Sequence, residues 1–179
     1  MIVGIDPGLA TCGFAVLDGE GRLYAAQCWT SKKSKEVGDT RRRLDGLLEW
    51  IDSRLVEVTV VTAFVVEFPA ANKGLGRSFK DPRAYLATGT VYGHVRSKGA
   101  PVLCPVPITW RSAAGRILGV EGSKGNEEFI HAKLDERYGV IASHGKTKAP
   151  HVLDAIGCAT YGLSLFAAQL ALVGADAAV

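Results

Sequence analysis

The feature that most constrains the fold is an apolar run in the first half of the chain. Thr59–Glu67 contains the segment VVTAFVVE, in which only the last residue is charged. An apolar run without alternation is typical of a strand that is buried on both faces. Because both faces of such a strand must be covered, the sequence predicts a sheet with helices on each side.

Three further β-like runs precede this segment and follow one another closely. They span Ile2–Asp6, Cys12–Leu17 and Arg22–Thr30, with a turn at Asp18–Gly21 between the second and the third. Short links between successive strands predict an antiparallel meander. The chain is therefore expected to open with three strands that pair in sequence order.

The remaining segments show helical spacing, one short strand and polar loops. Helices are expected at Thr40–Val56, Tyr85–Ser97, Thr109–Leu118, Asn126–Tyr138 (with Asn126 as N-cap) and from near Pro150 to about Val173, a strand at Val102–Val106, and loops at 31–39, 69–83, 119–125 and 142–149. This order predicts an α/β fold with a mixed sheet, the meander plus parallel strands, in a single domain over residues 1–179.

The composition is that of a folded protein from a reducing compartment. A hydrophobic fraction of 47% supports a core, while a formal net charge of +3 is too small to indicate nucleic-acid binding by itself. The four cysteines show neither CxxC spacing nor a zinc pattern. The N-terminus has no signal-peptide pattern, so we expect a cytoplasmic protein.

One stretch approaches the length of a membrane span. Ala155–Val173 contains no charged residue. Glycines and polar side chains interrupt it, and His151 and Asp154 stand just before it. We therefore expect a buried helix of the core and no contact with a membrane.

Four residues carry candidate chemistry. Asp6 and Glu67 each end an apolar strand, where a charge is costly unless it is paired or binds a metal. His151 and Asp154 are three positions apart at the start of the last helix and share one of its faces. Carboxylates with one imidazole suit Mg²⁺ or Mn²⁺, and two such ions can promote phosphodiester cleavage.

Each of the four also has an ordinary interpretation. Asp6 before Pro-Gly is typical of a turn, and Glu67 of a strand-end charge in water. His151 is compatible with an ordinary first helical turn, where Asp154 would interact favourably with the helix dipole. All four together, at the ends of elements, favour one metal site.

The same residues carry a resemblance to the RuvC family of Holliday junction resolvases. The opening GIDPGLATCGFAVLD resembles the family's first motif, VVEFP its second and HVLDAIG its C-terminal helix motif. The Gly-Ser-Lys segment around Lys124 falls where the family has a basic residue that contacts DNA. These matches span nearly the whole chain in the family's order.

The resemblance implies a ribonuclease H-like fold with a mixed five-stranded sheet and a metal-dependent endonuclease that cuts branched DNA at four-way junctions. It implies that Asp6, Glu67, His151 and Asp154 are the catalytic residues and the ligands of Mg²⁺ or Mn²⁺, with two ions per active site. It also implies a homodimer, whose two active sites cut opposing strands of the junction.

Two positions depart from the family's pattern. His151 stands where many members have an aspartate, and a histidine allows a changed metal preference or a role as general base. Phe68 directly follows the acid, whereas the family often has its exposed aromatic slightly later, where it disturbs bases at the crossover. Nuclease chemistry is therefore better supported than junction specificity.

Basic residues near these motifs predict contacts with DNA phosphates. The set is Lys73, Arg77, Lys80, Arg83, Arg111, Lys124, Lys146 and Lys148. Lysines and arginines in loops are also typical of ordinary solvated surface. We interpret Lys32, Lys33, Lys35 and the run 41–43 in that ordinary way.

Three alternatives stay open. The first keeps the fold but cuts other branched DNA or structured RNA. The second is an actin-like ATP-binding module, suggested by DPG before a glycine-containing turn, although the chain is short for two halves and lacks a Walker sequence. The third is a non-catalytic DNA-binding protein, against which four intact candidate ligands argue.

Overall fold

The centre of the fold is a mixed sheet. The computed structural model describes residues 1–33, 36–69, 82–120 and 127–176, the last eight by their backbone only. Five strands lie in the order β3-β2-β1-β4-β5, and they are β1 (Ile2–Asp6), β2 (Thr11–Leu17), β3 (Leu23–Thr30), β4 (Ala63–Val66) and β5 (Val102–Leu103). The first three strands pair antiparallel, and β1, β4 and β5 pair parallel. The predicted meander and mixed five-stranded sheet are confirmed.

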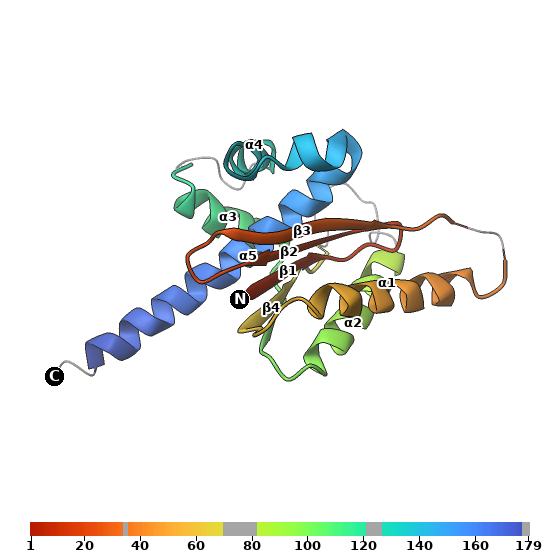
Figure 1. Cartoon of the computed structure of the whole chain (residues 1–179), viewed down its shortest axis with the longest axis horizontal. Coiled ribbons are helices and arrows are strands. Elements are labelled where there is room, and N and C mark those ends of the chain that lie inside the picture. The colour runs from red at the N-terminus through yellow and green to blue at the C-terminus, as the bar shows by residue number, and fades with distance from the viewer. Residues whose placement is uncertain (34–35, 70–81, 121–126, 177–179) are drawn as a thin grey trace, which may run out of the picture.

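Helices cover both faces of this sheet, as Figure 1 shows. The helices are α1 (Asp39–Leu55), α2 (Pro82–Arg96), α3 (Pro107–Ile117), α4 (Glu127–Tyr138) and α5 (Val140–Asp176). Strand residues alternate between two cores: Val3 and Ile5 pack with α1 and α2, whereas Ile2 and Val65 pack with α3, α4 and α5. All residues of β4 are buried, as its apolar sequence predicts.

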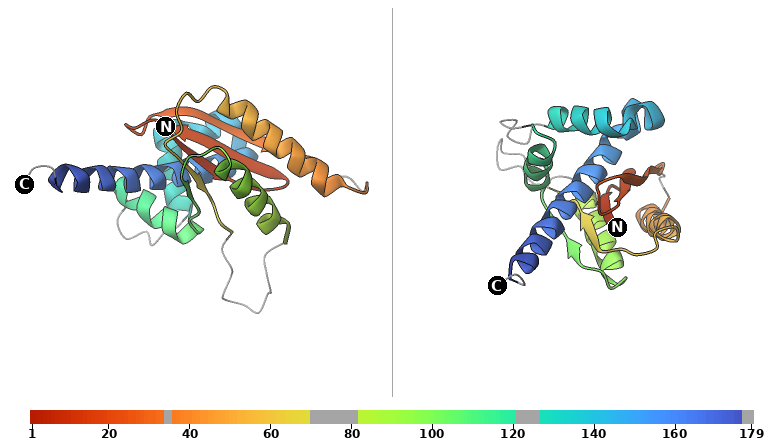
Figure 2. Two further views of the ribbon diagram at one scale, coloured as in Figure 1. Left: turned by 90° about the horizontal axis from the view of Figure 1, so that it is seen from below. Right: turned by 60° about the vertical axis from the view of Figure 1, so that its left-hand side comes forward.

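The helix α5 lies directly against the sheet. It crosses β1 and β2, and α3 and α4 pack on its other side (Figure 2). Two glycines allow this close approach. A methyl group on Gly4 would collide with the carbonyl oxygen of Ala155, and one on Gly13 with that of His151. The backbone of α5 therefore occupies space that side chains fill elsewhere on the sheet.

Two strands are shorter than the sequence predicts. β4 begins at Ala63 because its partner β1 begins at Ile2. The residues just before β4 form hydrogen bonds with Met1, which precedes β1. β5 ends at Leu103 because Pro105 has no backbone N–H for a sheet ladder. In both places the apolar sequence extends beyond the residues that pair with a neighbouring strand.

The prediction of a loop at 142–149 is wrong. These residues belong to α5, and only Gly145, at φ 74° and ψ 161°, is non-helical. Pro150 lies inside α5, five residues after this bend. Proline is favoured in the first turn of a helix, which explains why α2 and α3 begin at Pro82 and Pro107, slightly before their predicted starts.

The helix α5 is also long and apolar enough to span a membrane over Val140–Ala168, by length and composition alone. Half of its most apolar window is buried inside the protein. Within Val152–Thr160 every residue except Asp154 is buried, in contact with the sheet, α3 and α4. This part of the helix is the buried core helix that the sequence predicts.

We expect Gly4→Ala to destabilise the protein, since the added methyl group meets the α5 backbone. Overpacking of this kind lowers the free energy of unfolding by roughly 1–3 kcal/mol. Gly46→Ala in α1 is the matched control, because nothing lies near its new methyl group, and it should stabilise by up to about 1 kcal/mol. Urea denaturation measures both, and equal stability would contradict the close approach of α5.

Candidate metal centre

Asp6 and Glu67 lie side by side at the carboxyl ends of two parallel strands. β1 and β4 pair in register up to Ile5 and Val66, and the Glu67 N–H donates to Ile5 O at 2.8 Å. By alternation, the next position on each strand faces α5. The edge of a sheet at its strand carboxyl ends is where α/β proteins bind ligands.

The helix α5 brings the other two predicted residues to the same point. His151 Nδ1 lies 2.7 Å from Asp6 Oδ2. Asp154 offers a carboxylate oxygen within 4.8 Å of oxygens from Asp6 and Glu67. Gly13 pairs with Asp6 across the sheet, and its missing side chain admits the α5 backbone at His151. The four predicted residues thus converge from β1, the end of β4 and α5.

The three carboxylates repel one another in a poorly hydrated site. Burial, and then the charges of Asp6 and Asp154, raise the pKa of Glu67 to about 9. Burial also raises the pKa of Asp6, although its hydrogen bond with His151 opposes the rise. That hydrogen bond in turn raises the pKa of His151. Ionising all three carboxylates is therefore costly without a cation.

The surroundings of Glu67 Oε2 indicate whether the site fits a metal ion. Glu67 is only 9% exposed, and its Oε2 is buried without a hydrogen-bond partner among the described residues. A buried polar atom without a partner is rare, and a bound cation would give this oxygen a partner. With two more carboxylates beside it, the donor set is the oxygen-rich one that Mg²⁺ and Mn²⁺ prefer. The residues present fit a divalent cation.

A second layer of side chains surrounds Asp154. His131 Nε2 lies 2.8 Å from Asp154 Oδ1, and each side chain is 14% exposed. Arg111 Nη2 lies 2.7 Å from Glu127 Oε2 and 3.9 Å from Asp154 Oδ1. Glu127, His131 and Asp154 also lie close enough to hold an ion, but the guanidinium of Arg111 already supplies positive charge there. We therefore interpret this layer as support that orients Asp154.

His131 and Glu127 are not among the residues predicted from the sequence. They are four positions apart on α4 and share one face of it, and this spacing was the only available signal. Nothing in the sequence says that this face meets α5. That contact depends on how α4 packs.

The predicted DNA-binding residues are described only in part. Lys73, Arg77, Lys80 and Lys124 lie outside the described residues, as does the proposed N-cap Asn126. Lys146 and Lys148 are exposed on the helical segment after Gly145, not in a loop. Arg83 stands at the start of α2, and Arg111 faces the acids of the second layer. Their role toward DNA stays a prediction.

Phe68 is 41% exposed next to the metal centre. Its ring meets the edge of Tyr85, with ring centroids 5.8 Å apart. This contact holds Phe68 against α2. A role in disturbing bases at a crossover stays a prediction.

Solved structures with a similar fold include Holliday junction resolvases. Thermus thermophilus RuvC in complex with a Holliday junction substrate is 21% identical with a TM-score of 0.63, covering 95% of each chain. Another T. thermophilus RuvC structure is 18% identical with a TM-score of 0.60, covering 95% of this chain and 96% of that one. The yeast mitochondrial resolvase Ydc2 is 14% identical with a TM-score of 0.50, covering 90% and 77%.

These similarities are structural. No family model matches the chain, and no curated protein matches its sequence. At such low identities the comparison establishes the fold. The chain has the ribonuclease H-like fold of RuvC, as the sequence resemblance implies.

Without metal, we expect the free energy of unfolding to fall as the pH rises. The folded protein keeps a proton on Glu67 between its ordinary pKa of 4.5 and about 9, while the unfolded chain has released it. The raised pKa values of Asp6 and His151 act in the same direction. Urea denaturation across this pH range, in the presence of a chelator, measures the slope.

Glu67→Gln should flatten this slope, by up to a few kcal/mol over the range. Glu57→Gln, at an exposed position after α1, is the matched control and should leave the slope unchanged. A wild-type stability that is flat or rises with pH would contradict the burial of three carboxylates in one site.

Proposed function

We propose that the protein is a metal-dependent endonuclease that resolves four-way DNA junctions. The observation that carries the proposal is the convergence of Asp6, Glu67 and Asp154 within 4.8 Å at the strand ends. The fold supports it, since T. thermophilus RuvC has the same fold in its complex with a Holliday junction substrate. Branched DNA is then the substrate, and recombination and repair of DNA in the cytoplasm are the setting.

In this mechanism Asp6, Glu67 and Asp154 would hold Mg²⁺ or Mn²⁺, with two ions at full occupancy, and His151 would stand beside them on Asp6. When bound, such an ion would supply activation of a water molecule and stabilisation of charge on the phosphate oxygens. The carboxylates fix its position because the strands and α5 hold them rigidly. His131 keeps Asp154 in one orientation through its hydrogen bond.

His151 has a task of its own in the proposal. Its Nδ1 is tied to Asp6 at 2.7 Å, which fixes the plane of the ring. Its side chain is 39% exposed, so Nε2 can exchange a proton with water. In its neutral form, His151 would take a proton from the attacking water at Nε2 and release it to solvent.

Symmetric resolution needs two active sites. We propose that a homodimer of single-domain chains provides them, with one cut in each of two opposing strands. Sedimentation equilibrium on the free protein tests this directly.

The decisive experiment compares a labelled four-way junction with a linear duplex of the same sequence, in Mg²⁺ and in Mn²⁺. We expect paired symmetric cuts in the junction only. Asp6→Asn should abolish them, while Asp45→Asn on the exposed side of α1 should not. Equal cutting of both DNAs would reduce the protein to a general nuclease. Tight binding without cutting in either metal would overturn the enzyme proposal.

His131→Ala should weaken metal binding by about 10- to 100-fold, as the loss of an outer hydrogen bond to a ligand does. The metal concentration for half-maximal cleavage measures it, and excess metal should restore the rate. The matched control is His94→Ala, because His94 makes a 2.8 Å contact with Asp52 far from the site. If both variants show the wild-type metal dependence, His131 does not support Asp154.

A further inference from the structure

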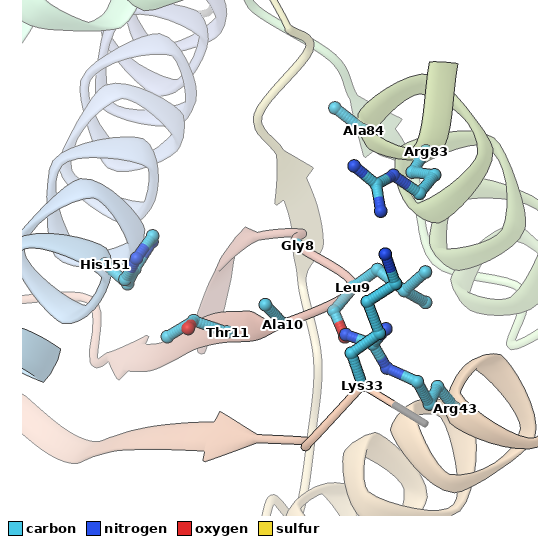
Figure 3. Close-up of a pocket in the computed structure, with 9 residues that line it drawn as sticks. All are labelled: Gly8, Leu9, Ala10, Thr11, Lys33, Arg43, Arg83, Ala84 and His151. Carbon is cyan, nitrogen blue, oxygen red and sulfur yellow. The ribbon is translucent and has the colours of Figure 1, made fainter. Parts of the chain in front are cut away.

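A pocket of about 360 Å³ opens beside the metal centre. The turn Gly8–Thr11 forms its floor, and His151 stands on one side. Lys33, Arg43 and Arg83 come from the other side (Figure 3). Because His151 also contacts Asp6, the pocket and the metal centre share a wall.

Positive charge dominates this pocket. None of the described residues that line it is acidic. Arg43 is a half-buried part of the wall, and it donates to Leu9 O at 2.6 Å and lies 3.6 Å from Asp39. Lys33 and Arg83 are exposed, and Figure 3 shows their side chains extending toward each other.

Two cations that converge in this way raise the local potential, and a bound anion would lower it. The start of α2 adds to the effect, because Arg83 and Ala84 lie in its first turn and line the pocket. The N-terminus of a helix carries partial positive charge and backbone N–H groups that suit phosphate. The converging cations and the start of α2 therefore both favour an anion at this point.

The rest of the lining is apolar. Leu9, Ala10 and Ala84 present carbon atoms to the cavity. A cationic rim with an apolar floor matches a phosphate attached to a sugar better than a free inorganic ion. The volume is at the lower end of ligand pockets, which suits one nucleotide.

We propose that this pocket binds the nucleotide next to the cleaved phosphate, with its own phosphate between Lys33 and Arg83 and its sugar against Leu9. The proposal rests on the proposed nuclease function, because a strand held at the metal centre must pass His151. It assigns a substrate contact to Lys33, which the sequence leaves as ordinary surface. It also assigns Arg83, which the sequence predicts to contact DNA phosphates, to this one phosphate.

A methylphosphonate scan tests this assignment. Single phosphates on either side of the cleavage position are replaced, one at a time, by neutral methylphosphonates in a labelled junction. Binding is measured in a chelator, so that no cleavage occurs. We expect one flanking position at which the replacement weakens wild-type binding by roughly 10-fold, the effect of one charge-assisted contact.

Lys33→Gln should reduce the sensitivity of binding to that one replacement, because one of the two cationic contacts with this phosphate is already absent. It should also reduce the salt dependence of log K by about one unit of slope. Lys32→Gln is the matched control, since Lys32 is the exposed lysine next to Lys33 and does not line the pocket. If no flanking position is sensitive, or if Lys33→Gln keeps the full sensitivity, the proposal is overturned.

A second probe separates this proposal from the nuclease function. Thymidine 3′,5′-bisphosphate, titrated against the metal-free protein, should bind wild type and Lys32→Gln but bind Lys33→Gln and Arg83→Gln at least about 10-fold more weakly. That result with no junction cleavage would keep the nucleotide pocket and remove the resolvase function. Junction cleavage with equal bisphosphate binding by all four proteins would overturn the pocket alone.

Discussion

The close packing of α5 on the sheet is the constraint on which the site depends. Two small residues on neighbouring strands, Gly4 and Gly13, leave room for a helix backbone where side chains would otherwise stand. This contact brings His151 and Asp154 to the strand ends that carry Asp6 and Glu67. A helix held further from the sheet, as ordinary side-chain packing requires, would leave these four groups too far apart to share an ion.

The site that results is unfavourable for the protein without metal. Three carboxylates share a buried corner, and the pKa of Glu67 rises to about 9 because its ionised form is poorly solvated and repelled. The surrounding structure tolerates this corner because it is built on rigid elements: two central strands, a core helix and the outer contacts of His131 and Arg111. Strain of this kind is typical of sites that a ligand completes.

The two sides of His151 have opposite character. Acidic side chains lie on the side of the strand ends, where a cation fits. Basic side chains lie around the Gly8–Thr11 turn, where an anion fits. The proposed substrate, a phosphodiester strand, would meet both requirements, since its cleaved phosphate would lie at the metal centre and its neighbouring phosphates need positive charge. The alternation of charge along this surface is therefore consistent with a single strand of DNA lying across it.

The sequence by itself determined the strands, the buried helix and the four candidate ligands, because apolar periodicity reports burial and a charge that ends an apolar strand stands out. It did not determine that 142–149 is helical, since glycine and proline signals there are equally those of a loop. Only the tertiary structure decided that His131 supports Asp154 and that Lys33, Arg43 and Arg83 line one pocket. These groups come from elements distant in the chain, and no local pattern encodes which faces of separate helices will meet.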